Sequence, residues 1–154
     1  MDLRARIQHD TKEAMKAKDQ LRLSTLRLIG AAVKDREIAL RGEGDGSGAL
    51  TDEDLVALLS RMVKQRQEST RAYEEGGRLE LAEREQAEIA IIQDYLPRQL
   101  DAAEIAAAVD RAIADLGASS VRDMGRVMGT LRERHAGQMD FGQVGALVKS
   151  RLMG

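Results

Sequence analysis

The chain contains no cysteine, so neither a disulfide nor a thiolate metal site can form. The thiol nucleophile of a cysteine-type glutaminase is excluded for the same reason. Histidine is nearly absent, and the two copies, His9 and His135, are too few for a histidine-based metal cage. The serines are scattered, and none lies in a nucleophile-elbow pattern. We therefore expect no catalytic residues, no metal site and no cofactor.

Aromatic side chains and long apolar runs are also scarce. The aromatic residues are Tyr73, Tyr95 and Phe141, and a base-stacking platform needs more stacking surface than three separate rings provide. No apolar stretch approaches the ~18 residues of a membrane span. The first residues are charged where a secretory signal would be apolar. We therefore expect a cytoplasmic protein without membrane contact.

The net charge of −2 hides an uneven distribution of charge along the chain. Residues 101–120 carry one arginine against four acids, which gives −3. Residues 121–154 carry six basic residues against three acids, which gives +3, and residues 12–41 carry eight against four, which gives +4. Local basic regions on an acidic protein fit a restricted phosphate-binding patch better than general coating of nucleic acid.

Apolar residues recur with the helical period along the whole chain, and the alternation typical of strands is missing. The sequence therefore predicts an all-α protein with four N-terminal and three C-terminal helices. The expected helices cover residues 3–18, 21–40, 51–75, 78–95, 101–116, 120–136 and 140–152. The glycine-rich residues 42–48 are expected to form a flexible loop.

Two helices carry the most specific core predictions. The apolar side of the first helix consists of Leu3, Ile7, Ala14 and Met15. The second helix is apolar on two sides, so we expect it to lie centrally in a bundle. One of these sides consists of Leu21, Leu28 and Ala32, and the other of Leu26, Ile29 and Val33.

A domain boundary is indicated around Pro97, the only proline of the chain. Proline moves the residue before it away from helical geometry. Asp101 with Glu104 then forms a helix-capping signature, and Gly117 suits the end of that helix. We place the boundary at residues 96–100, which divides the chain into an N-terminal domain, residues 1–96, and a C-terminal domain, residues 101–154.

The most informative stretch lies in the C-terminal domain, where Gly125 and Gly129 are four residues apart and share one helix face. Interior glycine costs a helix roughly 1 kcal/mol relative to alanine, so its presence needs a reason. Either a neighbouring helix packs closely inside the bundle, or a polyanion such as RNA docks on a smooth basic surface. The cations of this candidate surface are Arg122, Arg126, Arg132 and Arg134, extended by Lys149 and Arg151.

Several stretches of the chain resemble the YqeY family, nearly from end to end and in order. They are residues 22–27 (RLSTLR), 64–69 (KQRQES), 95–97 (YLP) and 123–128 (DMGRVM), with Gly137 and Asp140. Residues from about Asp101 onward also resemble the tail domain of GatB, a subunit of the amidotransferase that converts misacylated Glu-tRNA(Gln) or Asp-tRNA(Asn). In GatB this helical tail contacts the tRNA body and carries no catalytic centre. The resemblance implies a four-helix domain followed by a three-helix domain.

Other charged groups have competing interpretations. The acidic cluster Glu83, Glu85 and Glu88 has the groups for Mg²⁺ binding or acid–base chemistry, but we favour ion pairs with basic residues of a neighbouring helix, Lys64, Arg66 or Arg71. His135 is expected at a helix C-terminus, where its charge is favourable. A second basic group, consisting of Arg22, Arg27, Lys64 and Arg66, either binds RNA or forms interhelical ion pairs, and the sequence leaves both open.

The leading hypothesis is a non-catalytic, tRNA-associated accessory protein related to the glutamine-dependent amidotransferase metabolism of aminoacyl-tRNA. Its expected partners are tRNA and subunits of an amidotransferase or an aminoacyl-tRNA synthetase. One alternative is a protein–protein adaptor that never meets RNA. Another is an amidotransferase component that is active only in a complex.

Overall fold

The structure is a computed structural model that describes residues 2–42 and 50–153. Over these residues the chain forms seven α-helices and one short 3-10 helix and contains no strand, which confirms the expected all-α fold. Most of the expected glycine-rich loop lies outside the described residues. The chain divides into two compact units, Met1–Leu96 and Pro97–Gly154, and each is described by itself.

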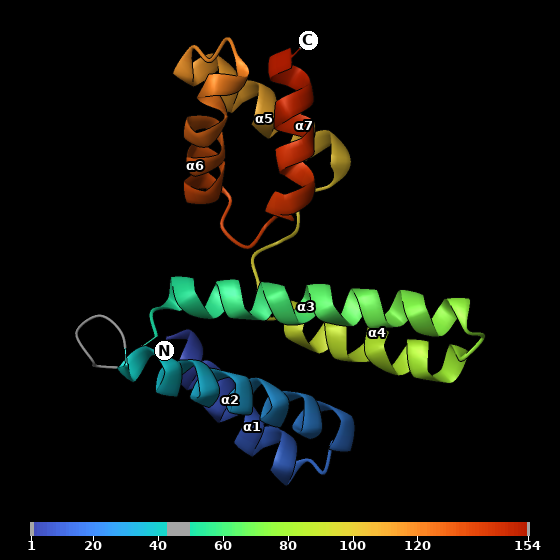
Figure 1. The fold of residues 1–154 in the computed structure, drawn as a ribbon. Coiled ribbons are helices and arrows are strands. Elements are labelled where there is room, and N and C mark those ends of the chain that lie inside the picture. Colours follow the sequence, from blue (N-terminus) through green and yellow to red (C-terminus); the bar gives the residue numbers. More distant parts are fainter. Residues whose placement is uncertain (1, 43–49, 154) are drawn as a thin grey trace. The chain divides into compact units, whose positions relative to one another are not determined.

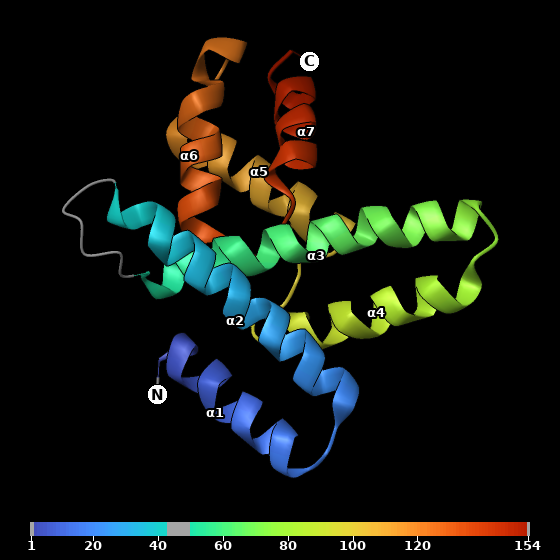
Figure 2. The same cartoon turned by 60° about the horizontal axis from the view of Figure 1, so that its bottom comes forward.

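The N-terminal unit consists of two helical hairpins. The first pairs α1 (Leu3–Lys16) with α2 (Gln20–Arg41), and the second pairs α3 (Asp52–Glu75) with α4 (Leu79–Gln93). Figures 1 and 2 show the two helices of each hairpin side by side. The core joins all four helices, and its fully buried large side chains include Leu26, Ile29, Leu55, Leu59 and Ile92.

Side-chain caps mark the starts of α1, α2 and α3. Asp2 and Asp19 accept backbone hydrogen bonds at the starts of α1 and α2, and Thr51 forms a reciprocal capping box with Asp54 at the start of α3. The first helix ends two residues earlier than expected, because Lys18 adopts a positive φ of 57° that a helix does not allow.

Two of the core predictions for this unit are wrong. Met15 is exposed, and on the second apolar side of α2 Leu21 and Leu28 are exposed, while Ala32 is half-buried against the core. The other apolar side of α2, with Leu26, Ile29 and Val33, is buried as expected. One side of α2 is therefore enough to hold it against the remaining helices. The helical period identified both apolar sides but carried no information on which one meets a neighbour.

The C-terminal unit packs α5 (Ala102–Leu116), α6 (Met124–Arg134) and α7 (Phe141–Met153) around its own core (Figure 1). A 3-10 helix, η1 (Val121–Asp123), leads directly into α6. The core is apolar throughout and includes Val109, Val127, Leu131, Val144 and Val148. Gly117 ends α5 with a left-handed φ of 62°, which glycine adopts without strain.

The segment after Pro97 belongs to the C-terminal unit. Leu100 donates its backbone N–H to the Gln138 carbonyl at 2.9 Å, and the Gln138 side chain donates to the Arg98 carbonyl at 3.1 Å. These bonds hold the approach to α5 against the turn between α6 and α7. Residues 97–100, which the sequence suggested as a junction, are therefore part of a folded unit.

No helix among the described residues is both long and apolar enough to cross a membrane.

Candidate nucleic-acid interface

The outer side of α6 is open. Val127, Met128 and Leu131 fill the core, while Gly125 and Gly129 are exposed on the other side of the helix. A Cβ atom added at either glycine would meet no other atom within 4 Å. Close helix packing inside the bundle is therefore not the reason for these two glycines, and that interpretation of the sequence is wrong.

Helical rotation separates the predicted cations into two groups. Successive residues of α6 turn by about 100°, so Arg132 lies within ~20° and Arg126 within ~100° of Gly125. Arg122, in the 3-10 helix before α6, precedes Gly125 by three residues, which is about one turn. Arg134, nine residues after Gly125, lies about 180° away. It pairs with Asp115 of α5 at 2.9 Å. The structure therefore brings Arg122 and Arg132 to the glycine side, with Arg126 at the edge of that side toward α5, and places Arg134 on the opposite side.

The three cations on or beside the glycine side are held to different degrees. Arg126 donates to the Leu116 carbonyl at 3.0 Å and to Asp123 at 3.3 Å, so its guanidinium is fixed against the end of α5. The guanidinium of Arg132 lies 5.7 Å from the centre of the Phe141 ring, a cation–π contact. Arg122 is exposed, and no ion pair of its side chain occurs within the described chain.

Asp123 organises the start of this surface. The backbone N–H groups of Ser119 and Ser120 donate to its carboxylate at 2.9 and 3.2 Å. These bonds, together with Arg126, lower the pKa of Asp123 below its usual range. The carboxylate therefore stays charged, caps the turn into α6 and keeps Arg126 in place.

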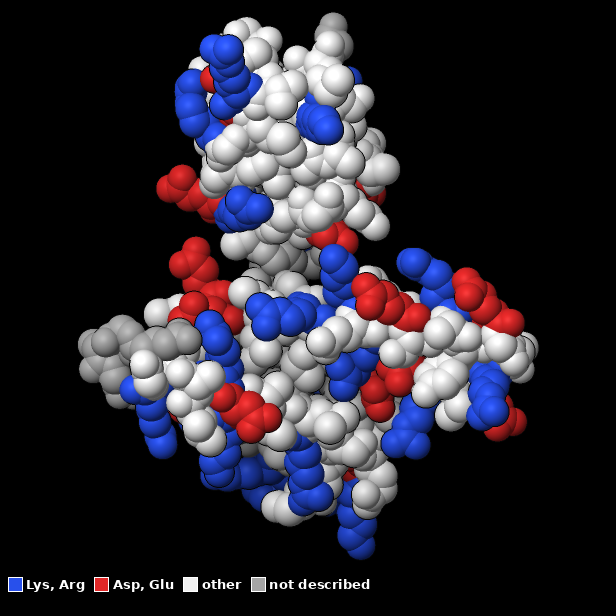
Figure 3. Space-filling view, in the orientation of Figure 1, with Lys and Arg blue, Asp and Glu red and all other residues white. Residues whose placement is uncertain are grey.

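The two cations predicted on α7 also separate. A Cβ at Gly145 would contact the terminal methyl groups of Met124 and Met128, so this side of α7 faces α6. Lys149 follows Gly145 by one turn and lies on that side. Arg151 reaches Asp110 of α5 at 3.6 Å instead. Figure 3 shows the face over α6 and α7 as a mostly uncharged surface with separate Lys and Arg side chains around it.

We call the resulting surface the α6 face. It joins five residues of η1 and α6 to one residue of α7, and its members are Arg122, Gly125, Arg126, Gly129, Arg132 and Lys149. Arg134 and Arg151, which the sequence assigned to the same site, lie toward α5. The sequence alone could have excluded Arg134 from this site, because the helical rotation places it on the side opposite the glycines.

His135 lies at the end of α6, as predicted. It is the C-cap residue, and its backbone N–H donates to the Leu131 carbonyl. Its ring Nδ1 is 3.1 Å from the side-chain oxygen of Gln138. This position is favourable for a cation, because the carbonyl end of a helix carries partial negative charge.

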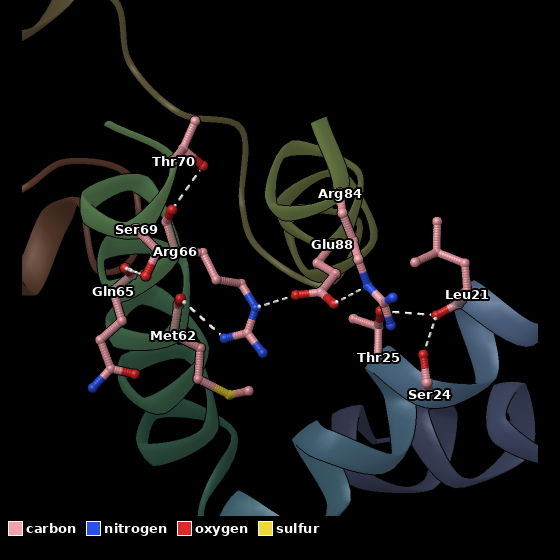
Figure 4. A network of polar contacts seen from close by, with 10 residues as sticks. All are labelled: Leu21, Ser24, Thr25, Met62, Gln65, Arg66, Ser69, Thr70, Arg84 and Glu88. Carbon is pink, nitrogen blue, oxygen red and sulfur yellow. Dashed lines mark hydrogen bonds and ion pairs between the residues drawn. The ribbon is translucent and has the colours of Figure 1, made fainter. Parts of the chain in front are cut away.

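The acidic cluster of α4 is not a metal site in the described structure. Glu88 is buried, and its carboxylate lies 3.1 Å from Arg66 of α3 and 3.7 Å from Arg84 (Figure 4). The expected ion pair with a neighbouring helix is therefore confirmed for Glu88. Within the described ranges, no group of three His, Cys, Asp or Glu side chains is arranged to hold a metal ion.

A second internal network involves Arg22 and Tyr95. The Tyr95 hydroxyl donates to Asp10 of α1 at 2.5 Å, and Arg22 of α2 lies 3.9 Å from the same carboxylate. The Arg6 guanidinium covers the Tyr95 ring at 4.7 Å. Burial, followed by the bond to Asp10, raises the pKa of Tyr95 well above its ordinary value. Arg22 and Arg66 are thus occupied inside the unit, and the predicted second basic group does not exist as one surface.

These observations define a class of protein: an all-helical chain in two units, whose second unit has a helix with two glycines open on its outer side. A family model described as "Yqey-like protein" matches residues 4–152, nearly the whole chain. The chain therefore belongs to the YqeY family, in agreement with the resemblance of its sequence motifs.

Curated relatives share one name, "Altered inheritance of mitochondria protein 41, mitochondrial". The protein of Lachancea thermotolerans is 36% identical over 116 residues, which cover 75% of this chain and 58% of the relative. The protein of Eremothecium gossypii is 34% identical over 117 residues, or 75% of this chain and 61% of the relative. A Saccharomyces cerevisiae protein is 33% identical over 87 residues, or 56% of this chain and 44% of the relative. The chain thus spans less than two thirds of the length of these relatives.

The expected cytoplasmic location is contradicted by this comparison, because the relatives are named as mitochondrial proteins. That expectation rested on the lack of a membrane span and of a secretory signal. Neither absence specifies a compartment, which is why the inference failed.

Proposed function

We propose that this chain is a non-catalytic, tRNA-associated accessory protein that contacts RNA through the α6 face. One observation carries the proposal: two exposed helical glycines have open space above them, with the exposed Arg122 and Arg132 on the same side and Arg126 and Lys149 at its edges. A phosphate backbone approaches such a surface closely, and arginine binds phosphate oxygens through its planar fork.

The link to tRNA and to glutamine-dependent amidotransferases comes from the resemblance of the C-terminal unit to the tail of GatB. The names of the curated relatives concern the inheritance of mitochondria and specify no ligand. The choice of RNA as the partner therefore depends on the chemistry of the α6 face and on that resemblance. Amidotransferase or synthetase subunits remain proposed protein partners.

The test compares two pairs of arginines in the same unit. Arg122→Ala/Arg132→Ala removes two cations from the α6 face, and the control Arg134→Ala/Arg151→Ala removes two that lie toward α5. Binding of a mixed tRNA preparation is measured between about 50 and 200 mM salt, where phosphate contacts dominate the salt dependence. We expect the first variant to reduce the slope of log K against log salt by about two, and the control to change it little.

Equal effects of the two variants would show general electrostatic attraction and would end the assignment to the α6 face. A third variant, Gly129→Leu, adds bulk without a clash, because the space above Gly129 is open. It should weaken tRNA binding while circular dichroism stays unchanged. An adaptor that docks only protein would show no tRNA binding at low salt, and that result would reject the proposal.

A further inference from the structure

We infer that α2 carries a second phosphate-binding surface, in the N-terminal unit. Its cations are Arg27, Lys34 and Arg41, which are seven residues apart. Seven residues advance a helix by about 10.5 Å and turn it to within ~20° of two full turns. The three side chains therefore begin from one side of α2 in a nearly straight row, which we call the α2 cation row. This inference rests on the proposed function, since it assigns the row to the same RNA.

The cations of the row are unoccupied. All three are exposed, and none of their side chains forms an ion pair or a hydrogen bond in the described part of the chain. Arg22, on the same helix, is instead engaged with Asp10 and Asp94. Figure 3 shows Lys and Arg side chains gathered over α1 and α2 with few acidic side chains between them. Unpaired cations retain their full attraction for an external anion.

Of the acids near the row in the sequence, Asp35 and Glu37 lie within the described residues, whereas Glu43 and Asp45 lie outside them. Asp35 is one residue after Lys34, so it begins about 100° further around the helix. Glu37 is engaged with Arg4 of α1, whose Nη2 atom lies 2.8 Å from its carboxylate. Within the described residues, neither acid pairs with the row, whose three cations are exposed.

Gly30 lies between Arg27 and Lys34 and opens the surface at that point. Glycine in the middle of a helix is unfavourable relative to alanine, and here packing does not require it, since an added Cβ would meet nothing within 4 Å. The glycine borders a hollow of about 220 Å³ between α1 and α2, which Gln8, Lys34 and the ion pair of Arg4 with Glu37 also line. One water molecule occupies about 30 Å³ of liquid, so the hollow has room for a phosphate group.

The surroundings of the row fit a phosphate backbone better than a lipid surface. A helix that lies in a membrane interface pairs its cations with a broad apolar side. Along this row the large exposed apolar side chain is Ile38, at 57% exposure. Leu28 begins about 100° around the helix from Arg27. A row of separate cations with open space at Gly30 suits an RNA strand, whose backbone carries phosphates at regular intervals.

The decisive comparison uses two triple variants, one that removes the three cations of the row and one that removes three other exposed cations. Arg27→Gln/Lys34→Gln/Arg41→Gln abolishes the row. The control Arg36→Gln/Arg61→Gln/Arg71→Gln also removes three exposed arginines, one from α2 on the side away from the row and two from α3. The probes are a mixed tRNA preparation, a short poly(U) strand, and vesicles of phosphatidylserine with phosphatidylcholine. We expect the row variant to reduce the salt slope for tRNA by two to three units, at about one unit per lost phosphate contact, and the control to reduce it much less.

The outcomes separate this inference from the proposed function. If the α6-face variant weakens tRNA binding while the row variant behaves like its control, only the inference falls. If the row variant alone weakens binding, the row stands and the α6 face falls. Loss of vesicle binding without loss of tRNA binding would assign the row to lipid and overturn the inference. Absence of tRNA binding by the unmodified chain at low salt would overturn both. Gly30→Leu, which fills the hollow without a change in charge, should lower tRNA affinity with helix content intact.

Discussion

Arg66 in the N-terminal unit reaches inward to a buried carboxylate, whereas Arg122 and Arg132 in the C-terminal unit stay at the surface around two open glycines. The N-terminal core contains charged and hydroxyl groups, with Glu88, Thr25 and Thr70 buried. The buried residues of the C-terminal unit are all apolar over the described chain, and its polar contacts include helix caps, exposed ion pairs and bonds between loop segments. Both units have apolar cores and helix caps, and the first unit adds internal charge pairing.

The largest expected effect concerns the internal pairing. Glu88→Ala leaves the Arg66 guanidinium, whose side chain is 14% exposed, without its partner. Breaking a buried pair in this way costs about 3 kcal/mol of unfolding free energy. Urea titration measures the loss, and the exposed Glu83→Ala is the control. If the double variant Arg66→Met/Glu88→Met is as unstable as Glu88→Ala, the pair does not act as described.

The next effect concerns Tyr95, which is 4% exposed. Tyr95→Phe removes the hydroxyl that donates to Asp10 and should cost about 1–2 kcal/mol. Because the pKa of Tyr95 is raised in the folded state above 10.0, its contribution is complete below pH 10.0 and is lost as the pH rises further. Denaturation at a series of alkaline pH values should show a steeper decline for the unmodified chain than for Tyr95→Phe. Parallel declines would show that Tyr95 does not control alkaline stability.

The C-terminal unit should be more sensitive to acid. The Arg98 guanidinium donates two hydrogen bonds to the Glu104 carboxylate, and the Asp101 backbone N–H donates a third. These bonds lower the pKa of Glu104 to about 2. Because this pKa is lowered in the folded state, the ionised Glu104 carboxylate stabilises the fold above the ordinary pKa of 4.5, and this stabilisation is lost as the pH falls toward 2. Far-UV circular dichroism of Glu104→Gln should therefore show a smaller acid-induced loss of stability than that of the unmodified chain. Asp101 is the partner of Glu104 in the capping box of α5. Asp101→Ala should therefore lower the free energy of unfolding by about 1 kcal/mol at neutral pH.

The smallest effect has the opposite sign. Gly125→Ala and Gly129→Ala place a methyl group in open space on a regular helix, so each should stabilise the chain by about 0.5–1 kcal/mol. Gly117→Ala is the contrasting variant, because its φ of 62° is strained for alanine, and it should destabilise the chain. Thermal melting distinguishes the two classes. Destabilisation by Gly129→Ala would show that the α6 face is occupied by part of the chain itself.

Much of the fold was predictable because its signals are local. The capping boxes of Thr51 and Asp101 and the left-handed Gly117 depend on residues at most four apart, and the structure contains all three. The partners of the charged side chains were not predictable to the same extent. Arg22 meets Tyr95, which is 73 positions away, and no helical period encodes such a contact.

The candidate sites show the same limit. The glycines of α6 were identified from their cost to the helix, but only the structure shows that no neighbour covers them. The seven-residue spacing of Arg27, Lys34 and Arg41 was visible in the sequence. It became meaningful once Arg22 and Arg66 were found to be occupied elsewhere. Sequence periodicity gives the direction of a side chain, and the packing determines whether that direction leads to solvent.

The packing of neighbouring helices also has a consequence for how the chain is made. Much of the packing joins consecutive helices, α1 with α2, α3 with α4 and α5 with α6. Chains with mostly local contacts close short loops and fold within microseconds to milliseconds. Because the first unit ends at Leu96, the four helices that pack within it are all synthesised before the second unit. During translation, the α2 cation row would therefore be presented to a polyanion while the α6 face does not yet exist.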